Sequence, residues 1–276
     1  MTQGRYYFRF NLYHRILHAM VIVSFLGLAV TGLPLKYAQT GWGLGLSHAL
    51  GGPFTAGYLH RFFAIVTFTY FALHLGYIAR LVLLRRPGIF WGPDSMVPQP
   101  RDLLQIGQHV RYFFGLGPRP RFGRWAYWEK FDYWAVFWGM AIIGGSGMML
   151  AFPAATASIL PGWLFNVATI IHGEEAILAA VFLFTVHFFN NHFRPDKFPL
   201  DTVMFTGAVP LEEFKREHAL EYKRLVASGE LARHLVDAPS QPMTLGSKIL
   251  GFSLIAFGLM LLVFVMTGWI GSMTVA

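Results

Sequence analysis

The sequence predicts an all-α integral membrane protein. Three observations support this: an apolar composition, five long apolar runs, and basic residues concentrated in alternate loops. Of the 276 residues, 55% are hydrophobic and 13% charged, which does not fit an ordinary soluble domain. The 27 Phe, 11 Tyr and 8 Trp suit aromatic rings at two membrane interfaces. Since there is no Cys, disulfides, thiolate-bound iron–sulfur clusters and covalently attached haem are excluded.

Five apolar runs are long enough to cross a bilayer, which requires about 20 helical residues. We place these transmembrane helices at residues 12–33, 56–84, 131–152, 163–191 and 246–270. The chain is then one membrane domain, 1–276, with long loops at 85–130 and 192–245. We expect the first four spans to form a four-helix bundle. The extra C-terminal span, which lacks a ligand-type residue, is expected to pack against another subunit or protomer.

Basic residues set the expected orientation. Most Lys and Arg lie before the first span and in the loops 85–130 and 192–245, whereas the first loop has only Lys36 and the third has none. Basic loops stay in the cytoplasm, so the N-terminus is expected to be cytoplasmic and the C-terminus outside. The net charge of +8 is then explained by loops near membrane lipid, and we expect no nucleic-acid partner.

Each long loop is expected to contain a helix. In the first, which is rich in Pro, residues 102–114 alternate apolar and polar side chains, as in a helix lying on the membrane surface. In the second, residues 211–235 carry mixed charges, which indicates a solvated helix.

Histidines inside the spans are the main functional signal, because an unpartnered imidazole in hydrocarbon is costly. His172 and His187 are 15 residues apart, about 22 Å along a helix and about 60° around it. His60 and His74 repeat this spacing, about 21 Å apart, on the second span. Together with His18, they indicate two metal centres at two depths. Two haem b groups with axial imidazoles from facing helices fit this pattern.

Non-haem metals and proton transport fit these histidines less well. Zinc or copper would need three or four ligands at one depth. A proton-relay transporter would add buried carboxylates on several spans, whereas only Glu174 and Glu175 qualify, both beside His172. His14 and His192 are interpreted as interfacial side chains.

Several motifs, taken in chain order, resemble one known family. They are Arg15-Ile-Leu-His18 followed by Thr31-Gly32, Tyr58-Leu-His60-Arg61, Phe131-Asp-Tyr-Trp134, His172-Gly-Glu-Glu175, His187-Phe-Phe-Asn-Asn-His-Phe193 and Phe198-Pro-Leu. The chain is similar to the di-haem cytochrome b subunits of formate dehydrogenase (the gamma subunit) and nickel–iron hydrogenase. It most closely resembles the branch that works with multihaem c-type cytochromes.

The resemblance implies a ligand set. It pairs His18 with His187 for a cytoplasmic haem and His60 with His172 for an outer one. His74 departs from the family pattern, and helix spacing alone would pair it with His187, so it remains a competing ligand. If His18 is the ligand, His74 lines a quinone pocket or holds a third haem.

Charged residues beside these histidines are expected to have supporting roles. Arg15 and Arg61 are expected to meet haem propionates. Glu175 is expected to pair with Arg61 or to hydrogen-bond a ligand. The candidates for a quinone site near the cytoplasmic haem, where a hydrogen-bonding His and a proton-conducting carboxylate are needed, are His18, His74, Glu129 and Asp132. Interfacial anchoring is the alternative for the two carboxylates.

The implied function is transmembrane electron transfer in a bacterial inner membrane, between menaquinone or ubiquinone and a periplasmic partner. That partner is a multihaem cytochrome, or an iron–sulfur/molybdenum or nickel–iron subunit of a hetero-oligomeric complex. The closer motifs favour quinol oxidation; quinone reduction for a formate dehydrogenase or hydrogenase is the alternative. The alternative from a different functional class is a membrane anchor or a transporter without redox activity. No nucleophile, Walker or dinucleotide motif is present, so we assign no catalytic residue.

Overall fold

The computed structural model describes residues 6–275, and side chains as far as Gly271. This part of the chain is mostly helical, and five of its helices are long and apolar enough to span a membrane, as predicted. These spans are Leu12–Lys36, Pro53–Leu83, Tyr127–Ala151, Trp163–Phe193 and Gln241–Gly271. Their ends differ from the predicted ones by a few residues.

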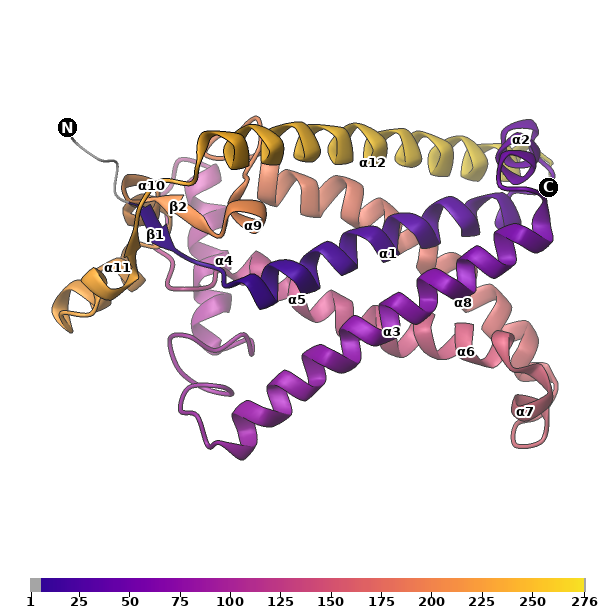
Figure 1. The fold of residues 1–276 in the computed structure, drawn as a ribbon, viewed down its shortest axis with the longest axis horizontal. Helices are drawn as coiled ribbons and strands as arrows, with labels where there is room; N and C mark the ends of the chain where they lie inside the picture. Colours follow the sequence, from indigo (N-terminus) through magenta and orange to yellow (C-terminus); the bar gives the residue numbers. More distant parts are fainter. Residues whose placement is uncertain (1–5, 276) are drawn as a thin grey trace. The chain divides into compact units, whose positions relative to one another are not determined.

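Figure 1 labels the elements along the chain. The helices of the spans are α1 (Leu12–Lys36), α3 (Pro53–Leu83), α5 (Tyr127–Gly139), α6 (Gly145–Ala151), α8 (Trp163–Phe182) and α12 (Gln241–Val275). The remaining α-helices are α2 (Gly41–Ala49), α4 (Pro100–Phe113), α7 (Pro153–Ala157), α9 (Val203–Thr206), α10 (Leu211–Glu217) and α11 (Ala219–Ala227). The strands are β1 (Tyr6–Phe8), β2 (Ala208–Pro210) and β3 (Leu235–Val236).

The chain, expected from its sequence to be one domain, divides into two compact units. The span unit consists of Ile16–Leu73, Val136–Asp201 and Ile249–Ala276. The loop unit consists of Met1–Arg15, His74–Ala135 and Thr202–Lys248. Helices α1, α3, α5 and α12 contribute residues to both units.

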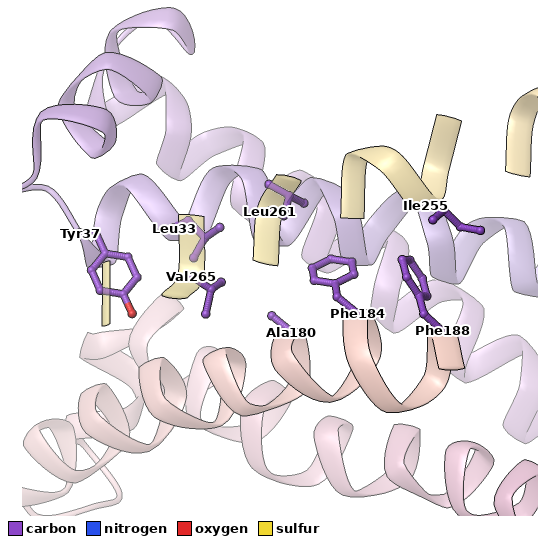
Figure 2. Close-up of a cluster of buried hydrophobic side chains, with 8 residues drawn as sticks. All are labelled: Leu33, Tyr37, Ala180, Phe184, Phe188, Ile255, Leu261 and Val265. Carbon is purple, nitrogen blue, oxygen red and sulfur yellow. The ribbon is translucent and has the colours of Figure 1, made fainter. Parts of the chain in front are cut away.

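The core of the span unit is a cluster of apolar side chains from three spans, drawn in Figure 2. Its buried members are Leu33, Tyr37, Ala180, Phe184, Phe188, Ile255, Leu261 and Val265. Gly258 lets α12 approach closely, since a Cβ there would lie 2.8 Å from the rings of Phe184 and Phe188. The fifth span therefore packs one face on the first and fourth spans of its own chain.

Short π-helical turns interrupt the third and fourth spans. They are η1 (Met140–Gly144), η2 (Leu183–His187) and η3 (Phe189–Phe193). Such turns shift the helical register by one residue and occur frequently at functional sites. Here η2 ends on His187, and η1 contains Ile143, whose carbonyl contacts His172.

The loop unit contains a small sheet, which the all-α prediction omitted. Its strand order is β2-β1-β3, and both pairings are antiparallel, with Tyr7 opposite Val209 and Leu235. Tyr7 also stacks on Phe214, with ring centroids 3.7 Å apart. Strands of two or three residues are too short to show the alternating pattern by which a strand is recognised.

The predicted single helix over 211–235 is wrong. The segment forms α10 and α11, a 3-10 turn η4 (Leu231–His234) and then β3. His218 separates the two helices with non-helical dihedrals, φ −115° and ψ 46°. The break lets Phe214 and Leu225 bury their side chains in one core with Tyr7. By contrast, the predicted helix in the first long loop is present as α4.

Candidate metal-binding site

His60 on α3 and His172 on α8 lie face to edge within the span unit. Their ring centroids are 6.2 Å apart and the ring planes form an angle of 76°. Imidazole nitrogens bind metals at about 2 Å, so two imidazoles on opposite sides of one ion have ring centroids about 6 Å apart. The observed separation matches that arrangement.

In both histidines, the ring nitrogen Nδ1 has polar partners in the protein. The His172 Nδ1 lies 3.0 Å from the Ile143 carbonyl oxygen and 3.3 Å from the Ser146 hydroxyl. A carbonyl only accepts, so Nδ1 carries the proton and Nε2 keeps its lone pair. On the other side, the His60 Nδ1 lies 3.0 Å from the Thr31 hydroxyl, which itself donates to the Gly27 carbonyl. Both imidazoles can thus offer Nε2 to a metal, with Nδ1 fixed from behind.

Two glycines make room for these rings. A Cβ at Gly147 would lie 2.9 Å from the His172 Cε1, and a Cβ at Gly32 would lie 3.1 Å from the His60 Cε1. Both distances are shorter than ordinary carbon contacts of about 3.5–4.0 Å. Thr31 and Gly32 therefore act on the same imidazole, one by a hydrogen bond and the other by leaving space.

The charged residues near this pair make contacts that the sequence did not indicate. Lys36 pairs with Glu174 at 2.8 Å, and Glu175 accepts a hydrogen bond of 3.3 Å from the Trp138 indole. Arg61 lies over the Tyr58 ring, 5.9 Å from its centroid. Among the described contacts, Glu175 is therefore hydrogen-bonded to the Trp138 indole and Arg61 is stacked on the Tyr58 ring, whereas the sequence suggested that the two would pair with each other.

His18 and His187 also belong to the span unit. His18 interacts electrostatically with both His187 and His192. The Asn191 amide nitrogen donates to the His187 carbonyl at 2.9 Å and lies 3.1 Å from the His187 Nδ1. The structure thus places His18 and His187 near each other within the span unit.

His74, the competing ligand, lies in the loop unit. Its Nε2 is 2.9 Å from the Tyr133 hydroxyl, and the two ring planes are 77° apart. It interacts electrostatically with His14. A protein hydroxyl thus contacts one of the two ring nitrogens with which His74 could bind a metal.

The other predicted site residues also lie in the loop unit. The Arg15 guanidinium donates to the Phe205 carbonyl. Glu129 accepts from the Arg9 guanidinium at 2.8 Å through one oxygen and from the Ala126 amide at 2.7 Å through the other. Asp132, one turn further along α5, is partly buried.

Sequence reasoning missed the side chains that hold the histidines. The Thr31-Gly32 step was noted as part of a motif, but it had no assigned role. Ser146 and Gly147 carried no signal because they contact His172 only through the packing of the third span on the fourth. The apolar third span contains no histidine, so nothing in its residues connected it with a ligand.

Comparison with models of known protein families and with curated proteins finds no match for this chain. Within residues 6–275, no group of three or more His, Cys, Asp or Glu side chains is arranged to hold a metal ion. A metal ion bound between His60 and His172 would therefore have a set of two protein ligands. Such a set suits an ion whose remaining positions are filled by a macrocycle, and haem iron held by two imidazoles is a group of that kind.

Proposed function

We propose that this chain is a transmembrane electron carrier holding two haem b groups, which joins a quinone pool to a redox partner across a bacterial inner membrane. Bound haem would supply one-electron redox chemistry at two depths. The protein would supply the ligands, their orientation and an apolar surrounding. The motif resemblance to di-haem cytochrome b subunits supports the same interpretation.

The observation that carries the proposal is the His60–His172 geometry. Two helices place these rings at a separation suited to one shared metal, and each Nδ1 has a polar partner. An imidazole packed only for structure would have no need to keep Nε2 available. A hydrogen bond to Nδ1 fixes the ring and increases the electron donation of the ligand, which tunes the redox potential.

For the second haem we propose His18 and His187, as the resemblance implies. His18 and His187 belong to the same unit and are close enough to interact electrostatically, which supports this pair. The contact of the His74 Nε2 with Tyr133 supports a different role for His74. It favours the quinone-pocket interpretation, in which an imidazole and a phenol act as hydrogen-bonding groups. Under this proposal a third haem is not needed.

Anchoring is the role that the contacts of Glu129 favour. Both of its carboxylate oxygens accept hydrogen bonds, one of them from a buried arginine. A proton-conducting role would require this carboxylate to release Arg9, which costs free energy. We therefore keep His74 and Asp132, which both belong to the loop unit, as the quinone candidates of first choice.

The direction of electron flow is part of the proposal. The closer motif resemblance favours quinol oxidation with delivery to a periplasmic multihaem cytochrome. The alternative is quinone reduction with electrons from a formate dehydrogenase or hydrogenase. The electron-transfer rates of the purified full chain with a quinol and with a quinone would separate the two.

The haem content of the purified full chain tests the proposal. We expect a Soret band, and a pyridine haemochrome assay giving two haem b per chain. A chain that folds and inserts without haem, even when haem is supplied during expression, would instead support the non-redox anchor or transporter.

A further inference from the structure

Helix α4 in the loop unit has an unusual division of its faces. Its polar residues Asp102, Gln105 and His109 are buried, whereas its apolar residues are exposed. The exposed fractions are 72% for Leu103, 38% for Ile106, 48% for Val110 and 69% for Phe113. These four side chains form a strip about 80° wide around the helix. A helix on the surface of a soluble protein would bury such a strip.

The buried polar face is tightly held by the protein. The Lys130 ammonium pairs with Asp102 at 2.8 Å, and both side chains are almost fully buried. The Gln105 amide donates to the Arg121 carbonyl at 3.0 Å, and the His109 Nδ1 lies 3.0 Å from the Tyr127 hydroxyl. Because these contacts fix the rotation of α4, its apolar strip must face outward.

These contacts also show how α4 runs relative to α5. Asp102 and His109 are about 10 Å apart along α4, yet they meet Lys130 and Tyr127, which are only about 4.5 Å apart along α5. Two helices running alongside each other would pair residues at matching separations. Helix α4 therefore crosses the start of α5, at one end of the span Tyr127–Ala151. A helix that crosses the end of a span is positioned to lie along the membrane interface.

We infer that α4 is an interfacial helix whose strip of Leu103, Ile106, Val110 and Phe113 inserts into a bilayer leaflet rich in anionic lipid. Two observations favour lipid as the occupant. The first turns of α5 also carry an exposed apolar side chain, Phe131, which is 62% exposed. The loop unit also carries basic side chains that complement anionic headgroups, namely Arg80, Arg85, Arg86, Arg101 and Arg111.

This inference does not depend on haem or quinone. It assigns the apolar side chains of the α4 strip to acyl chains and the arginines of the loop unit to headgroups. The buried Asp102–Lys130 pair then has a positioning role, because it holds the strip at a fixed angle to the membrane plane.

The absence of Cys makes a direct test possible. Single-cysteine variants Val110→Cys and Leu103→Cys place a nitroxide label on the strip. Gln108→Cys, an exposed position about 160° around the helix from Val110, is the matched control. The full chain is reconstituted in vesicles of phosphatidylethanolamine and phosphatidylglycerol. Power-saturation EPR then compares collisions of the label with oxygen, which concentrates in lipid, and with a water-soluble nickel chelate.

We expect labels at positions 110 and 103 to collide preferentially with oxygen and the label at position 108 with the nickel chelate. Preferential collision with nickel at both strip positions would overturn the inference. Protection from both reagents would also overturn it, since a second copy or another subunit would then cover the strip. Should one strip variant fail to fold, the other gives the same readout.

Discussion

The imidazoles of His60 and His172 come from different spans, yet their ring centroids lie 6.2 Å apart with planes at 76°. Each ring has a polar partner at Nδ1 and a glycine beside Cε1. The pair thus combines three features: a ring separation suited to one metal ion, a hydrogen bond that fixes which ring nitrogen carries the proton, and space beside each ring. Single substitutions can change each feature separately.

Gly147→Ala should disturb this site through His172. The added Cβ would lie 2.9 Å from the His172 Cε1, so the ring must move away from its present position. We expect loss of at least half of one haem per chain, measured by the pyridine haemochrome assay. Gly145→Ala is the control, because its Cβ meets nothing within 4 Å. Equal haem content in the two variants would argue against a ligand role for His172.

Thr31→Val should raise the midpoint potential of the haem that we propose for the His60–His172 site. It removes the hydroxyl 3.0 Å from the His60 Nδ1, so the imidazole becomes a weaker electron donor and the ferric state is less stabilised. A hydrogen bond of about 1 kcal/mol corresponds to a shift on the order of tens of millivolts in a redox titration. Thr31→Ser keeps the hydroxyl and should stay close to the parent value. A steric effect alone would instead shift the serine variant as well.

His18→Ala should remove one haem, whereas His74→Ala should keep both. His18 shares the span unit with His187, while the His74 Nε2 already contacts the Tyr133 hydroxyl. Optical and EPR spectra of the two variants provide the measurement. The reverse result would assign the ligand role to His74, as helix spacing alone suggested.

Alkaline pH should destabilise the loop unit through Tyr7. Burial, together with the neighbouring Glu221 carboxylate, raises the pKa of Tyr7 from 10.0 to about 12. The neutral phenol, which donates to Glu221 at 2.9 Å, is therefore favoured by folding. Its contribution is present below pH 10 and is lost as the pH rises through about 12. In Tyr7→Phe, this alkaline loss should disappear, and stability at neutral pH should fall by about 1 kcal/mol.

Protease protection of the loop unit between pH 9 and 12, compared in the parent and in Tyr7→Phe, provides the measurement. Identical profiles in the two proteins would assign the alkaline transition to another group.

The spans could be predicted because lipid imposes long apolar runs, and the histidines could be noticed because they interrupt such runs. The contacts of Thr31, Ile143 and Ser146 could not be predicted, since they depend on how α1 and α6 pack on their neighbours. For α4, the helix was predictable from its period. Which face is buried depends on Lys130, which is 28 residues from Asp102 in the sequence.

The low-spin ferric spectrum of the full chain and of three variants tests the central claim most directly. We expect His60→Ala and His172→Ala to lose the same haem, with its EPR and near-infrared magnetic circular dichroism signals of bis-imidazole ligation. His48→Ala, at an exposed position on α2, should keep both haems. The double variant should lose no more haem than either single one. Retention of both haems in the His60 and His172 variants, or loss of a different haem from each, would contradict the account.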